Sequence, residues 1–210
     1  MKKVNFVDCA LIVLFILVFN GCVSVSNSPN PRFYMPSSMS KEEVTEKIDI
    51  ASGIIVAVGP VVIPEYIDRP QIVTKNKNGT FNFAQFDRWT EPLDSSLTRL
   101  INDDLTILLP AASFQLFPCS LAIPLDYQVI MDVTRLDSEL DKDMTFIVQW
   151  SVIDAKNRKL LFTKRSQFTK PINPHNYFGV TKALSDACVS LSREIAENLV
   201  NISKKPELAK

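Results

Sequence analysis

Hydrophobic and polar residues follow two different periods along this chain. Apolar residues recur every three to four positions over residues 92–110 and 176–201, which predicts two long amphipathic helices. Alternating or short apolar runs predict an antiparallel meander of four strands at residues 113–118, 127–137, 144–154 and 159–169. Together these patterns predict an α+β fold, a curved and mostly antiparallel β-sheet with both helices packed on one face.

The first 21 residues have the pattern of a lipoprotein signal peptide. A basic head is followed by an apolar run over residues 9–19, which is shorter than the roughly 20 residues that span a bilayer. Gly21 directly precedes Cys22, so we expect cleavage before Cys22 and acylation of its thiol. Val23 rather than Asp follows, which favours the outer membrane, on its periplasmic face. The alternative is an uncleaved anchor with Cys22 as an ordinary thiol.

Polarity divides the rest of the chain into three parts. Residues 22–31 are rich in Ser, Asn and Pro and are expected to form a flexible tether. Residues 32–203 hold the predicted helices and strands and form one domain. Residues 204–210 are polar and are expected to be a loose tail.

A proline-rich stretch runs from Gly59 to Val73, and we call it the rim segment. Three prolines with β-branched residues between them exclude a helix and favour an extended path. Because proline cannot donate to a sheet ladder, we expect an edge strand or the arm leaving one, not a central strand. Its exposed middle carries the predicted partner-binding residues Tyr66, Asp68 and Arg69, an aromatic ring and an ion pair. The alternative is a covered sheet edge with structural Asp68 and Arg69.

The rim segment resembles the signature of the ABC-type transport auxiliary lipoproteins of the PqiC (YmbA) group. In that signature Gly-Pro-Val is followed by Pro-x-Tyr-(Leu/Ile)-Asp-Arg-Pro-Gln-(Leu/Ile)-Val, and the rim segment matches it almost residue for residue. Arg88–Leu93 is similar to a second element of the family, and Gln149–Val152 to a third, a Trp within a later strand. With the lipoprotein start, the resemblance covers essentially the whole chain.

The resemblance implies a function in lipid transport. It implies a non-enzymatic subunit that works beside an MCE-domain, PqiB-like protein to move phospholipid between membranes and maintain the envelope. The rim segment would then dock either on that partner or on sister subunits, closing a homo-oligomeric ring. A second hypothesis is a periplasmic carrier, in which a groove between helices and sheet holds a lipid or another small apolar ligand.

Composition excludes several other functions. The single histidine, His175, has no cysteine or carboxylate at ligand spacing, so no metal site is predicted. The five glycines form no phosphate-binding loop, and no cofactor or catalytic group is predicted. With 23 basic and 23 acidic side chains, the chain has no charge excess that would favour nucleic acid. Cys119 and Cys188 are a candidate disulfide in an exported domain, with two buried free thiols as the alternative.

Overall fold

The computed structural model describes residues 28–43, 49–119 and 124–204. The predicted signal peptide, Cys22 and the tail beyond Lys204 lie outside these residues. From Pro31 onward the chain forms one compact unit, which holds two sheets and two long helices. The predicted α+β class is confirmed, but the expected single sheet is divided into two.

The larger sheet has five strands in the order β5-β2-β6-β7-β8. Their bounds are β2 Ile55–Val62, β5 Ser113–Leu116, β6 Tyr127–Ser138, β7 Asp143–Asp154 and β8 Lys159–Pro171. The chain β6-β7-β8 is the predicted antiparallel meander. The prediction was wrong for β5, which lies at the opposite edge and pairs parallel to β2. The hydrophobic pattern of a strand of four residues is too short to indicate which strand it will pair with.

The smaller sheet has three strands in the order β1-β4-β3. A hairpin whose turn contains Asn78-Gly79, a pair typical of tight turns, joins β3 (Gln71–Lys75) to β4 (Phe81–Trp89). The pairing shifts register between Gln71 and Val73, which marks a β-bulge in this hairpin. Strand β1 (Arg32–Tyr34) pairs parallel to β4 and forms an edge of this sheet.

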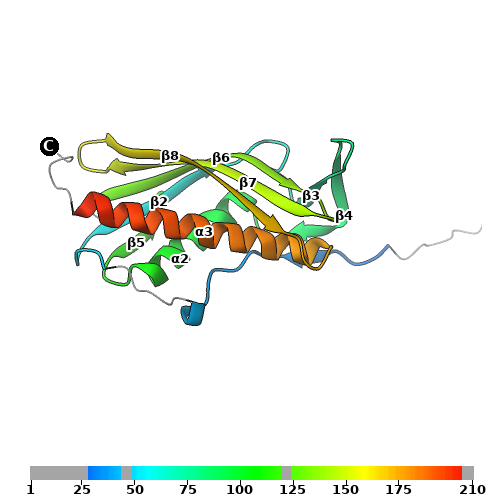
Figure 1. Ribbon diagram of the computed structural model, residues 1–210, viewed down its shortest axis with the longest axis horizontal. Helices are drawn as coiled ribbons and strands as arrows, with labels where there is room; N and C mark the ends of the chain where they lie inside the picture. The colour runs from blue at the N-terminus through cyan, green and yellow to red at the C-terminus, as the bar shows by residue number, and fades with distance from the viewer. Residues whose placement is uncertain (1–27, 44–48, 120–123, 205–210) are drawn as a thin grey trace, which may run out of the picture. The chain divides into compact units, whose positions relative to one another are not determined.

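Both helices cover one face of the larger sheet, as predicted (Figure 1). Helix α2 (Leu93–Leu108) lies against β2 and β5, and α3 (Tyr177–Ser203) lies against β7 and β8. A 3-10 turn, η1 (Lys41–Glu43), precedes the larger sheet. Trp150 is fully buried between the layers, and its indole donates a hydrogen bond to Ser166 Oγ at 3.0 Å. Trp89 is also buried, at the entrance to α2.

The position of Pro60 corrects the prediction that the rim segment avoids a central strand. Pro60 lies inside β2, which runs between β5 and β6. The strand accommodates it because β5 pairs only as far as Val58, and the pairing with β6 shifts register between Val58 and Val61. The missing N–H of Pro60 therefore falls beyond the last β5 pair and within a bulge. Locally, the second half of β2 has only one neighbour.

Candidate functional site

The rim segment connects the two sheets. After β2 the chain forms a tight turn over residues 64–68, closed by a hydrogen bond from Asp68 N to Pro64 O at 3.2 Å. Ile67 of this turn is buried in the hydrophobic core. The chain then enters β3 at Gln71. Because of this turn the middle of the rim segment is not extended, although it is not a helix either.

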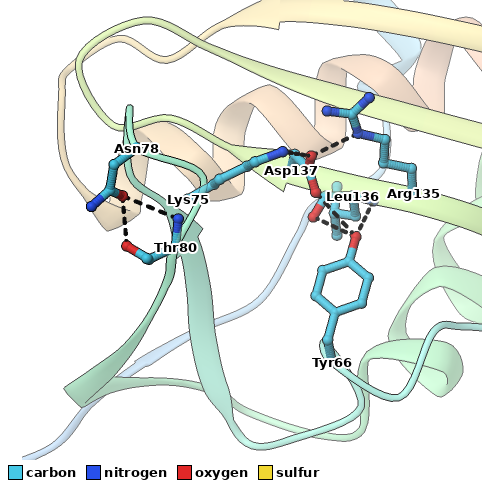
Figure 2. A network of polar contacts seen from close by, with 7 residues as sticks. All are labelled: Tyr66, Lys75, Asn78, Thr80, Arg135, Leu136 and Asp137. Carbon is cyan, nitrogen blue, oxygen red and sulfur yellow. Dashed lines mark hydrogen bonds and ion pairs between the residues drawn. The ribbon is translucent and has the colours of Figure 1, made fainter.

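Tyr66 binds the larger sheet from this turn (Figure 2). Its hydroxyl accepts a hydrogen bond from Leu136 N at 2.9 Å and lies 3.2 Å from both Leu136 O and Asp137 Oδ1. Its ring lies 4.9 Å from the ring of Phe81 in the smaller sheet, centroid to centroid. Burial raises the pKa of Tyr66. Tyr66 therefore links the two sheets, and much of its ring is unavailable to a partner.

Asp137 is the centre of the polar contacts around Tyr66 (Figure 2). Its Oδ2 accepts from Lys75 Nζ at 2.8 Å and from Arg135 Nε at 2.6 Å. Burial alone would raise the pKa of Asp137, but the hydrogen bonds from Lys75 and Arg135 outweigh it and hold the pKa below the ordinary value. We call Tyr66, Lys75, Arg135 and Asp137 the Asp137 network. It joins the rim segment, β3 and β6.

The sequence did not indicate Asp137, because the alternation of buried and exposed residues shifts within β6. In β6 the residues Val129, Met131 and Val133 are buried, which follows strict alternation. The pairing with β7 then shifts register between Val133 and Arg135, and Leu136, Asp137 and Ser138 are all buried. A single bulge changes which residues face inward, and the sequence carries no clear signal of it. The sequence offers only a weaker signal for Asp137, which is the Arg-x-Asp pair at the end of the strand.

Asp68 and the half-buried Arg69 line a hollow of about 290 Å³, which we call the rim hollow. Its walls are Asp68, Arg69, Pro70, Trp89, Thr90, Glu91 and Pro92. Among the ion pairs of the described residues, Asp68 and Arg69 are not joined, so the predicted ion pair is wrong. Instead the Arg69 guanidinium lies over the Phe83 ring at 4.2 Å, a cation–π contact. Asp68 is exposed.

A buried carboxylate, Asp104 of α2, connects the segment that contains Met39 to both helices. Asp104 Oδ1 accepts from Met39 N at 2.8 Å, and Oδ2 accepts from Ser192 Oγ of α3 at 3.0 Å. Ser37 N also donates to Ser185 Oγ at 3.0 Å. Burial raises the pKa of Asp104 to about 6, because two hydrogen bonds do not replace the lost hydration.

Replacing Asp104 by asparagine is expected to stabilise the protein by about 2 kcal/mol at pH 8. An acid with a raised folded pKa holds its proton between about pH 4 and 6 where the unfolded chain has lost it, so stability falls as pH rises through that window. The advantage of Asp104→Asn therefore shrinks towards pH 4. Urea unfolding at several pH values measures this, with exposed Asp103→Asn as the control. A constant difference between pH 4 and 8 would contradict it.

Cys119 and Cys188 are both free thiols in the structure, which corresponds to the alternative without a disulfide. Cys188 is fully buried on the apolar side of α3, and burial raises the pKa of its thiol. Cys119 is half-buried after β5, and its Sγ lies 3.4 Å from Leu116 O. A disulfide formed after export stays a prediction.

The described residues contain no cluster of three or more His, Cys, Asp or Glu side chains that could hold a metal ion. His175 is exposed, and its Nδ1 lies 2.8 Å from Leu140 O. Within the same residues, no helix has the length and apolarity needed to cross a membrane. The arrangement around the rim segment is one of ion pairs, aromatic contacts and a shallow hollow, which suits structural linkage and surface recognition.

The family of the chain follows from a family model. The model of the ABC-type transport auxiliary lipoprotein component matches residues 38–196, which is most of the domain. The chain belongs to this family. The match includes the rim segment, Asp137, all of α2 and α3 as far as residue 196. The resemblance inferred from the rim segment is thereby confirmed, and the protein is an auxiliary lipoprotein component of a transport system.

Solved structures share the fold at low sequence identity. A crystal structure of an uncharacterized protein has a TM-score of 0.66 at 16% identity, over 81% of this chain and 99% of that chain. The crystal structure of a Xanthomonas campestris protein assigned to family DUF330 has a TM-score of 0.63 at 14% identity, over 84% of this chain and 99% of that chain. A comparison with curated proteins found no match.

Proposed function

We propose that this protein is the outer-membrane-anchored, periplasmic subunit of an MCE or Pqi-type system that moves lipid between membranes. The observation that carries the proposal is family membership across residues 38–196, together with a rim segment that matches the PqiC signature. The proposed role is non-enzymatic: the protein positions a partner at the membrane. An MCE-domain, PqiB-like protein is the proposed partner.

The anchor in this proposal is an acyl chain on Cys22. Cleavage before Cys22 would leave ten residues, 22–31, between the membrane and β1. Even when fully extended, ten residues reach only about 35 Å. The domain would therefore remain close to the periplasmic surface of the outer membrane.

The partner surface in this proposal is the rim hollow with Asp68 and Arg69. Asp68 is exposed, and apolar walls from Pro70, Trp89 and Pro92 surround the charged groups. Such a mixture of charge and fixed apolar surface is typical of a protein interface. Tyr66 contributes indirectly, because its contacts with β6 and Phe81 fix the turn that carries Asp68. The same surface would serve for self-association in a ring.

The interior of the described part of the chain does not favour the carrier hypothesis. Most of the space between the helices and the larger sheet is filled by fully buried side chains, among them Leu105, Trp150 and Leu184. A hollow of about 320 Å³ between α2 and the ends of β2 and β5 has a partly polar lining that includes Asp94 and Arg99. The rim hollow opens at the surface, between the rim segment and the start of α2, and is not a deep apolar cleft for an acyl chain.

The anchor is tested by Cys22→Ser in cells, followed by separation of inner and outer membranes. The wild-type protein is expected to be in the outer-membrane fraction with its leader removed. Cys22→Ser is expected to leave that fraction, because no acyl chain can form, whereas Cys119→Ser is expected to behave like wild type. If Cys22→Ser stayed in the outer membrane with a processed leader, the proposed anchor would be wrong.

A further inference from the structure

An apolar edge of the smaller sheet lies where the N-terminal segment enters the domain. Phe33 of β1 and Met35 just after it are each 61% exposed. They are two residues apart in an extended segment, so their side chains project from the same side. Large apolar side chains exposed together at one edge are uncommon on a domain surrounded by water.

The edge is held firmly against β4. Arg32 Nε and Nη2 donate to the two oxygens of Asp87 at 2.8 and 2.9 Å, and Tyr34 OH donates to Asp87 Oδ1 at 2.8 Å. Asp87 is buried, so this paired contact is partly shielded from water. Arg32 and Tyr34 alternate with Phe33 and face the opposite way. The hydrogen bonds of Arg32 and Tyr34 to Asp87 therefore hold β1 in the orientation in which Phe33 faces outward.

A cationic side chain lies beside Phe33 on the same face. Phe33 is the register partner of Arg88 in β4, and side chains of paired residues lie on one face of a sheet. Arg88 Nε is buried without a hydrogen-bond partner, and no ion pair to Arg88 is found in the described parts of the chain. The guanidinium is therefore not committed to a carboxylate of its own domain. A lipid phosphate is an anion that suits it.

We propose that Phe33, Met35 and Arg88 form a membrane-seating face, which rests on the phospholipid surface to which the chain is anchored. This inference rests on the proposed anchor. The apolar side chains would enter the interfacial layer, and the Arg88 guanidinium would bind lipid phosphate. The occupant follows from the chain length, because the ten residues from Cys22 to Pro31 end directly at β1 and limit how far this edge can lie from the bilayer.

The membrane-seating face also explains how the partner surface is presented. Thr90 N donates to Tyr34 O at 3.0 Å, and Thr90 is one of the residues that line the rim hollow. The rim hollow therefore adjoins the segment that carries Phe33 and Met35. A partner bound at Asp68 and Arg69 would therefore lie next to the membrane surface to which lipid has to be delivered.

The test uses full-length acylated protein in vesicles of phosphatidylethanolamine and phosphatidylglycerol. An environment-sensitive fluorophore is placed at Met35→Cys in a Cys119→Ser background, and quenchers are attached to the lipid head groups. Leu160→Cys is the control, because Leu160 is 56% exposed and lies in β8 of the larger sheet, whereas Met35 follows β1 of the smaller sheet. Quenching at position 35 is expected to exceed that at position 160 by about fivefold, and Phe33→Ser is expected to reduce it by about half.

The possible outcomes separate the two proposals. Equal, weak quenching at both positions on protein that floats with the vesicles would overturn the membrane-seating face and leave the anchor standing. Failure to float with the vesicles would overturn the anchor and the membrane-seating face together. If position 35 is shielded equally in detergent and in vesicles, and this shielding rises with protein concentration, the face contacts a second copy of the chain. That result would also overturn the inference.

Discussion

Gly179→Ala is expected to lower the free energy of unfolding by at least about 3 kcal/mol. A Cβ atom at position 179 would lie 1.8 Å from the carbonyl oxygen of Pro174 and 2.9 Å from its carbonyl carbon. Both are backbone atoms, so the clash cannot be relieved by a side-chain rotation. The first turn of α3 would have to move, and the hydrogen bond from Gly179 N to Asn176 Oδ1, which caps the helix at 3.0 Å, would weaken.

Urea unfolding followed by circular dichroism measures this effect. Gly53→Ala is the control, because a Cβ there meets nothing within 4 Å and only the positive φ of 84° opposes it. That control is expected to cost about 1 kcal/mol. Equal unfolding midpoints for the two variants would show that α3 does not pack against Pro174 in solution.

Asp137→Ala is the second substitution with a large expected effect, about 2 to 3 kcal/mol of lost stability. It would remove the acceptor of Lys75 and Arg135 and leave the ammonium of Lys75 largely enclosed without its carboxylate. The contact with Tyr66 OH would also disappear. Because the rim segment is held to β6 through this network, the rim hollow is expected to loosen as well.

The pH dependence distinguishes this network from a surface contact. A carboxylate with a lowered folded pKa contributes stability above its unfolded pKa, near 4, and loses that contribution as pH falls through the folded value. The difference between wild type and Asp137→Ala should therefore shrink below pH 4. Asp141→Ala is the control, since its ion pair with Lys77 is long, at 3.7 Å, and exposed. A pH-independent difference, or one equal to that control, would rule out the network as a source of stability.

Local patterns in the sequence were sufficient for the two helices and for the part of the meander formed by β6, β7 and β8. Each depends on contacts between neighbouring segments or on the periodicity of one face. The sequence failed where pairing is long-range and parallel, as for β5 on β2 and β1 on β4. Parallel neighbours are not joined by a turn, so no short motif records their register. The division into two sheets follows from the same missing information.

The candidate site was predicted in part. The sequence located the rim segment, and exposed Asp68 and half-buried Arg69 do line a hollow. It did not show that Tyr66 faces inward, because a tyrosine in a proline-rich stretch is compatible with either orientation. The partners of Tyr66 are about 70 residues away in β6, and a bulge turns Asp137 towards it. Part of the family signature is therefore explained by structural linkage between the sheets.

Binding of an MCE-domain partner at the rim hollow is tested by crosslinking in living cells. A photo-crosslinking residue is placed at Asp68 in the full-length protein, and at exposed Leu160 as the control. Mass spectrometry of the products is expected to identify an MCE-domain protein from position 68 and not from position 160. Recovery of lipid alone, or of no MCE-domain protein from position 68, would contradict partner binding at the rim hollow.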